Sequence, residues 1–153
     1  MGIYSTCVAC TGHICCTNQA GNQLIPWILP EEVGTIRSVV GGSCDFFEPP
    51  ESGEVFGRLK RDASGDCLFL TPNGCSLGDA KPYDCKMFPY DVVRTKVGYY
   101  LIRYTHLCPR SEKWDSDLSS VTELALRCGR DYALKHERVA HPYVLIGALE
   151  QLN

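Results

Sequence analysis

Eight of the ten cysteines in this chain fall into two groups, and a bound metal explains their arrangement better than any other use of cysteine. The eight are Cys7, Cys10, Cys15, Cys16, Cys67, Cys75, Cys85 and Cys108. Thiolates are the ligands that structural zinc and iron–sulfur clusters take from proteins. The pattern therefore predicts a chain that folds around a thiolate-bound metal. It indicates the chemistry of the site better than it indicates the biological task of the protein.

The first group lies within residues 1–22, which contain few aliphatic residues and read as a loop that metal ligands hold in place. The two-residue spacing of Cys7 and Cys10 lets both sulfurs reach one metal while the intervening amides turn toward them. Cys15 and Cys16 are adjacent, so their side chains point in different directions. One is expected to be a ligand, and the other a bridge, a ligand of a second site or a packed thiol.

The second group places Cys67, Cys75 and Cys85 among turn-forming residues, with Cys-Leu-Phe-Leu at the first and Lys-Pro-Tyr-Asp-Cys-Lys-Met-Phe-Pro around the last. With Cys15-Cys16 and the Pro-Glu-Glu run at residues 30–32, these motifs resemble the YkgJ-type cysteine-cluster family of zinc- or iron-chelating domains. The family pattern has a cysteine group ending in Cys-Cys, a helix led by Pro-Glu-Glu, Cys-x-Phe-Leu, a further cysteine, and Arg-Pro-x-x-Cys-Arg-x-Phe-Pro.

The resemblance covers residues 7–109, because Cys108-Pro109 matches a later cysteine of the family. Two features depart from the pattern. Lys81 and Lys86 replace the two arginines that flank the third cysteine, and four residues separate Cys10 from Cys15 where the family has two. The resemblance implies metal binding, and some family members are labelled iron–sulfur oxidoreductases. It implies no single established reaction, so a role as an oxidoreductase component stays open.

Zinc and iron–sulfur clusters both accept four thiolates, so the ligand count cannot distinguish them. Structural zinc favours compact paired ligands, whereas these cysteines are scattered along the chain and include a Cys-Pro pair of the kind found at ferredoxin ligands. We therefore expect a [4Fe-4S] cluster, with zinc as the alternative. Eight cysteines could also supply two sites. Copper is disfavoured because the chain has only two methionines.

Other reactive residues have simpler interpretations. Cys44 and Cys128 are expected to pack in the core, since one lies in a glycine-rich stretch and the other on the apolar face of an expected helix. Among the four histidines, only His13 lies within the first cysteine group and only His106 lies near Cys108, and neither is favoured as a ligand; His136 and His141 are more simply helix-end residues.

Charged and aromatic residues surround the second group. Lys81 and Lys86 could offset the negative charge of a thiolate site, or they could be solvated surface residues. The nearby aromatic residues could shield a cluster from water, but ordinary packing is the favoured interpretation. They are Tyr83, Phe88, Tyr90, Tyr99, Tyr100 and Tyr104.

Length and composition predict one α+β domain spanning residues 1–153, a small irregular fold with short hairpins and a few helices around the metal centre. Its motif region is 7–109 and its helical C-terminal segment is 111–153. A net charge of -3 gives no general attraction to nucleic acid. No secretory signal or run of about 18 apolar residues is present, so we expect no membrane insertion and a cytoplasmic location. In that reducing compartment, clustered cysteines favour metal over disulfides.

Local signals predict the elements. Residues 29–40 read as a helix with Pro30 at its first position, Glu31 and Glu32 at its positive end, and Gly41-Gly42 as its stop. Residues 55–60 and 67–70 read as strands joined through 61–66, and 90–95 with 97–104 as a second hairpin. A helix is expected over 120–139, followed by a short helix over 143–152.

Three functions compete on these grounds. The first is an iron–sulfur protein that transfers electrons, or serves as a redox accessory subunit, with a protein partner. The second is a zinc-binding structural, interaction or metal-handling module without catalysis. The third is thiol–disulfide exchange at Cys7 and Cys10 or at Cys15 and Cys16, which is disfavoured because neither pair lies in a thioredoxin-like strand-then-helix setting.

Overall fold

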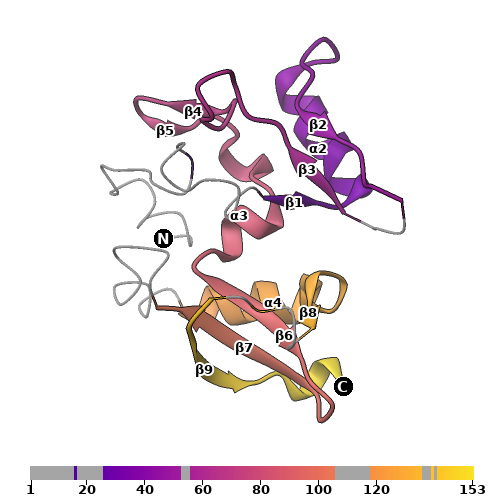
Figure 1. The fold of residues 1–153 in the computed structure, drawn as a ribbon, viewed down its shortest axis with the longest axis vertical. Helices are drawn as coiled ribbons and strands as arrows, with labels where there is room; N and C mark the ends of the chain where they lie inside the picture. Colours follow the sequence, from indigo (N-terminus) through magenta and orange to yellow (C-terminus); the bar gives the residue numbers. More distant parts are fainter. Residues whose placement is uncertain (1–15, 17–25, 53–55, 106–117, 136–138, 140) are drawn as a thin grey trace. The chain divides into compact units, whose positions relative to one another are not determined.

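A computed structural model describes residues 16, 26–52, 56–105, 118–135, 139 and 141–153. The chain forms two compact units (Figure 1). The cysteine unit is Cys7–Lys86, and the sheet unit is Met87–Asn153 together with Met1–Thr6. Each unit is treated separately below. The single-domain organisation expected from the sequence stays a prediction.

The first helix of the cysteine unit, α2, spans Pro30–Val40 and confirms the expected helix. Pro30 stands at its first turn, where a missing backbone N–H costs nothing. Gly41 ends it with φ 86°, a conformation that favours glycine, and donates its N–H to the Arg37 carbonyl at 2.9 Å. Ile36 is fully buried, so α2 has a core-facing side.

A three-stranded antiparallel sheet follows the order β1-β3-β2. The strands are β1 (Trp27–Ile28), β2 (Phe47–Glu48) and β3 (Gly57–Leu59). Gly57 pairs with Ile28, and a Cβ at Gly57 would collide with the Phe47 ring and the Glu48 carbonyl. The sheet therefore requires glycine at the middle strand for a steric reason.

The rest of the cysteine unit consists of four short elements. They are β4 (Leu70–Thr71), β5 (Gly74–Cys75), the 3₁₀ turn η3 (Gly78–Ala80) and the helix α3 (Tyr83–Met87), whose last residue belongs to the sheet unit. β4 pairs with β5 in a hairpin. The expected pairing of 55–60 with 67–70 is wrong, because β1 and β2 occupy both edges of β3. The two segments are joined instead by one isolated bridge between Arg61 and Cys67.

The cysteine unit has a hydrophobic core of its own. It consists of Ile28, Ile36, Phe46, Leu59, Phe69, Leu77 and Ala80. Cys44, Cys67 and Cys75 pack against this core from partly buried positions. Arg37 lies over the Phe46 ring, 5.1 Å from its centroid, and covers the core with a cation–π contact. Two of the candidate ligands are thus attached to an ordinary apolar cluster.

The sheet unit contains a four-stranded sheet of order β8-β6-β7-β9. Its strands are β6 (Tyr90–Arg94), β7 (Tyr99–Tyr104), β8 (Leu134–Lys135) and β9 (Tyr143–Ala148). The β6–β7 hairpin confirms the expected one, and the Thr95 N–H closes it on the Gly98 carbonyl at 2.8 Å. The helix α4 (Leu118–Tyr132) packs against β6, β7 and the 3₁₀ turn η6 (Glu150–Leu152) (Figure 1).

The C-terminal part corrects two expectations. The helix expected over 120–139 ends at Tyr132, because Leu134 and Lys135 pair in parallel with Val93 and Arg94 of β6. The helix expected over 143–152 is wrong, because Tyr143–Ala148 is a strand paired with β7. Its Tyr-Val-Leu-Ile run favours extended structure, and a short apolar run fits helix or strand equally by periodicity. Segment 111–153 is therefore not a uniformly helical segment.

The α+β class expected from the sequence is confirmed by these small sheets and few helices. Within the described residues, no helix combines the length and apolar character that a bilayer crossing requires.

Candidate metal centre

Four of the predicted ligands lie in the described part of the cysteine unit, namely Cys16, Cys67, Cys75 and Cys85, and all four are half-buried. We call them the four-cysteine group. The other four predicted ligands, Cys7, Cys10, Cys15 and Cys108, lie outside the described residues, as do His13 and His106.

Backbone contacts bring Cys16 to Cys67. The Cys67 N–H donates to the Cys16 carbonyl at 2.7 Å, and Cys67 also forms the single bridge to Arg61. The Leu70 N–H then donates to the Cys67 carbonyl at 3.1 Å, which turns the chain toward β4. Cys67 is thereby anchored through its backbone on both sides.

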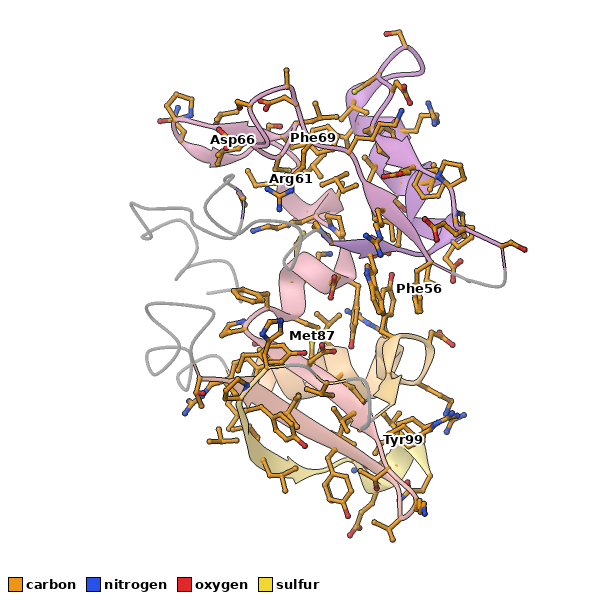
Figure 2. All side chains as sticks on the ribbon, in the orientation of Figure 1. Phe56, Arg61, Asp66, Phe69, Met87 and Tyr99 are labelled. Atoms are coloured by element: carbon orange, nitrogen blue, oxygen red, sulfur yellow. The ribbon has the colours of Figure 1, made fainter. Side chains whose placement is uncertain are left out.

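The loop between Arg61 and Cys67 is closed by the Asp62 carboxylate. Its Oδ1 accepts hydrogen bonds from the Ser64 N–H at 2.8 Å and the Asp66 N–H at 3.1 Å. The Ser64 hydroxyl is the largest influence on Asp62 and lowers the pKa of that carboxyl. Arg61 donates from Nη1 to the Gly65 carbonyl at 3.0 Å across the same loop. Figure 2 shows Arg61 and Asp66 in this region, together with Phe69.

The β4–β5 hairpin returns the chain to the same place. Cys75 pairs with Leu70, and the Ser76 N–H donates to the Phe69 carbonyl at 2.8 Å. Gly74 has φ 102° in the turn, where other residues would be strained, and the Thr71 hydroxyl donates to its carbonyl at 2.8 Å. A tight turn therefore places Cys75 opposite Leu70, which follows Cys67 closely in the chain.

Cys85 lies in the middle of α3, a helix of five residues. The Lys86 N–H donates to the Pro82 carbonyl at 2.9 Å, and the Lys86 ammonium donates to the Asp79 carbonyl at 2.9 Å. Lys86 therefore ties α3 to the η3 turn. Of the two lysines predicted to offset charge, Lys81 is the one whose charge acts on the Cys85 thiol.

Burial and mutual charge raise the pKa values of the thiols. Burial raises the pKa of Cys67 to about 11, and the charges of Cys16 and Cys75 act in the same direction. Burial also raises the pKa of Cys85 well above its usual value, with the Asp84 charge next in size and the charges of Cys16 and Cys67 contributing. The charges of Cys16 and Cys75 therefore act on Cys67, and those of Cys16 and Cys67 act on Cys85.

Groups that stabilise thiolates act on both Cys67 and Cys85. A backbone hydrogen bond from Phe69 and the Arg61 charge both lower the pKa of Cys67, and the Lys81 charge lowers that of Cys85. Hydrogen bonds to sulfur and nearby cations are the outer contacts that tune thiolate metal sites. Cysteine thiols beside cations and a backbone donor are the residue types that thiolate-bound metals use. Sequence reasoning missed Arg61, and only its bridge to Cys67 reveals it.

Two carboxylates next to Cys85 were also missed as parts of the site. The Trp27 N–H donates to Asp84 Oδ2 at 2.9 Å, and the Tyr83 N–H donates to Glu32 Oε1 at 2.7 Å. Burial raises the pKa of Asp84 to about 6; the Trp27 hydrogen bond opposes this, and the Glu32 charge adds to it. Glu32 was expected only to favour the helix dipole, and its sequence position contains no signal of a distant partner.

Within the described residues, no three His, Cys, Asp or Glu side chains meet closely enough to form an ion-binding group. The four-cysteine group is thus defined by backbone pairing and mutual charge.

The remaining cysteines and aromatic residues are mainly packed. Cys44 contacts the core of the cysteine unit, and Cys128 lies half-buried on α4. Tyr83 is buried in the cysteine unit, whereas Tyr90 and Tyr104 are buried in the sheet unit. The Tyr104 hydroxyl donates to Asp91 Oδ2 at 2.8 Å.

Comparison with protein-family models, curated proteins and solved structures found no match to this chain. The resemblance to the YkgJ-type family stays a prediction.

Proposed function

We propose that this chain is a metal-binding protein whose cysteine unit holds a thiolate-bound centre. The observation that carries the proposal is the placement of Cys16, Cys67, Cys75 and Cys85 in one compact unit, where the Cys67 N–H donates to the Cys16 carbonyl and the charges of neighbouring cysteines act on Cys67 and Cys85. Four thiolates are a complete ligand set for zinc or for an iron–sulfur cluster. Cys7, Cys10, Cys15 and Cys108 stay candidates for the same centre or for a second one.

The surroundings support a role for these thiols as ligands. The raised pKa of Cys67 keeps that thiol protonated near neutral pH, which would be a poor arrangement for a thiol nucleophile. A metal replaces such protons, and Arg61, Lys81 and the Phe69 N–H would offset the negative charge that the thiolates bring. These contacts favour a role for Cys67 and Cys85 as metal ligands over a role as nucleophiles.

The proposed centre is an iron–sulfur cluster, [4Fe-4S] in the first instance, which supplies one-electron redox chemistry when bound. The members of the four-cysteine group come from separate segments. Cys67 lies in the loop before β4, Cys75 lies in β5, Cys85 lies in α3, and Cys16 precedes all of them in the chain. Such dispersed ligands suit a cluster better than the paired knuckles typical of structural zinc. The function would be electron transfer, or service as a redox subunit of a larger enzyme, with a protein partner.

Zinc is the alternative, and one observation favours it. Cys75 lies in β5 and Cys67 precedes β4, so the tight β4–β5 turn lies between them, and a backbone N–H of Phe69 is directed at the Cys67 sulfur. Zinc-binding loops use paired ligands with hydrogen-bonded sulfurs of this kind. A zinc centre here would stabilise the cysteine unit without catalysis and would make the chain an interaction or metal-handling module.

The test is anaerobic purification followed by an absorption spectrum and by iron, sulfide and zinc analysis of the same sample. Broad visible absorption with iron and sulfide supports the cluster, and a colourless protein with stoichiometric zinc supports the alternative. Cys67→Ser, Cys75→Ser and Cys85→Ser should each lower the metal content. Cys44→Ser and Cys128→Ser are matched controls at half-buried cysteines outside the four-cysteine group and should not. Equal metal content in all five variants would refute the proposed site.

A further inference from the structure

The helix that carries Cys85 is too short to hold itself in place. An isolated helix needs about 12–15 residues to be even marginally stable in water, and α3 has five. Its first residue, Tyr83, has a backbone N–H without an acceptor inside the helix, as at every helix start. The position of the Cys85 sulfur therefore depends on contacts between α3 and the rest of the cysteine unit.

Glu32 provides one such contact with both of its oxygens. Oε1 accepts from the Tyr83 N–H at 2.7 Å, and Oε2 accepts from the Leu29 N–H at 3.0 Å. One side chain thus joins the start of α2 to the start of α3, which lie far apart in the sequence. Hydrogen bonds to an ionised acceptor are shorter and stronger than neutral ones, and both of these are partly shielded from water.

Asp84 provides a second contact in the opposite direction. It belongs to α3, and its Oδ2 accepts from the Trp27 N–H of β1 at 2.9 Å. Glu32 of α2 therefore accepts a hydrogen bond from the backbone of α3, and Asp84 of α3 accepts one from the backbone of β1. Two such bonds at successive residues restrict both the position and the rotation of α3. They therefore also restrict Cys85, which is the next residue in the sequence.

We propose that Glu32 and Asp84 form a carboxylate clamp that positions the Cys85 thiol in the metal centre. The clamp rests on the proposed function, because it concerns the same site. Neither residue needs to touch the metal. They act through the backbone of α3, as residues outside the ligand shell do when they orient metal ligands. Loss of such a residue typically lowers metal affinity about tenfold to a hundredfold.

The simpler alternative is that Glu32 only caps α2. In that case its replacement would lower the stability of α2 without changing the number of thiolates on the metal or the metal affinity of the folded protein. Glu31 is a control for this, because it lies in the same first turn and carries the same charge but is exposed. Glu31→Gln and Glu32→Gln make the same chemical change at neighbouring positions.

The experiment uses full-length, metal-free protein loaded separately with cobalt(II) and with ferrous iron plus sulfide. Thiolate-to-metal absorption reports the number of bound sulfurs, and competition with a chelator gives the cobalt affinity. Glu32→Gln should weaken cobalt binding about tenfold relative to Glu31→Gln, and its thiolate absorption should fall toward that of Cys85→Ser. Asp84→Asn should have a smaller effect, because its amide oxygen can still accept from the Trp27 N–H.

Identical affinity and spectra for Glu32→Gln and Glu31→Gln would overturn the clamp while leaving the proposed centre intact. If Glu32→Gln does not fold, Glu32→Asp replaces it. Aspartate keeps the charge but is one methylene shorter, so it should lose one of the two hydrogen bonds and weaken cobalt binding in the same direction. Wild-type protein that takes up neither cobalt nor iron and sulfide on its thiols would overturn the proposed function, and the clamp with it.

Discussion

The sheet unit and the cysteine unit differ in how much regular structure they contain. In the sheet unit, β7 and β9 have six residues each and α4 has fifteen. In the cysteine unit, β1, β2, β4 and β5 have two residues each. Long strands satisfy most of their backbone groups with one another, whereas short ones leave the chain to be held by side chains. The comparison teaches that the two units depend on different interactions.

Side chains provide that support in the cysteine unit. The Asp62 carboxylate closes the loop before Cys67, and Glu32 and Asp84 fix α3. Cys67 and Cys75 pack against the apolar core, so a metal bound to these two cysteines would be linked to the core through their side chains. The cysteine unit should therefore respond to metal removal, and the sheet unit to changes in its core.

Metal removal should have the largest effect and should be confined to one unit. Binding of a structural metal by thiolates contributes about 10 kcal/mol or more, which is comparable with the whole stability of a small domain. After chelation, hydrogen exchange should speed up at the amides of Cys67 and Ser76 and stay slow at Tyr104 and Leu149, all of which donate backbone hydrogen bonds. Equal loss of protection in both units would break the comparison.

Core truncation in the sheet unit should have the next largest effect. Ile102 is fully buried, so Ile102→Ala should lower the free energy of unfolding by about 2–5 kcal/mol. Val97 is 77% exposed, and Val97→Ala should cost less than about 0.5 kcal/mol. Denaturant unfolding followed by circular dichroism measures both. A fall in metal content in Ile102→Ala would show that the units are not independent.

Two glycines of the cysteine unit should respond to alanine in opposite ways. Gly57→Ala places a Cβ against the Phe47 ring and the Glu48 carbonyl, and it should cost about 1–3 kcal/mol in the stability of that unit. Gly34 lies in α2 with open space around it, so Gly34→Ala should stabilise the unit by about 1 kcal/mol. Metal-loaded protein should be used for both unfolding curves. Equal effects would contradict the close packing of β2 on β3.

An exposed ion pair should have the smallest effect. Lys60 and Asp45 approach to 2.6 Å, but the Asp45 side chain is 79% exposed. Asp45→Asn should therefore lower stability by less than about 1 kcal/mol, and by less still in high salt. The measurement is denaturant unfolding at two salt concentrations. A larger loss would mean that an exposed ion pair stabilises the cysteine unit as much as its partly buried carboxylates do.

Local sequence signals predicted the elements that are delimited by residues at their own ends. Pro30 and Gly41 delimit α2, and the Thr95–Gly98 turn joins two runs of strand-forming residues. The cysteine spacing predicted thiolate chemistry, and the structure places four of those cysteines in one unit. Helix ends and turns can be predicted because each depends on residues that are close together in the sequence, and ligand chemistry can be predicted because it depends on residue type.

The sequence by itself thus determined the helix α2 and the β6–β7 hairpin, and it predicted thiolate ligands. Only the tertiary structure decided that Tyr143–Ala148 is a strand, since that depended on the free edge that β7 offered. It also decided that β3 pairs with β1 and β2, and that Glu32 reaches the backbone of α3. The physical reason is the same in each case. A strand edge can pair with any suitable strand and a buried N–H can donate to any suitable acceptor, so the folded chain determines which partner is within reach.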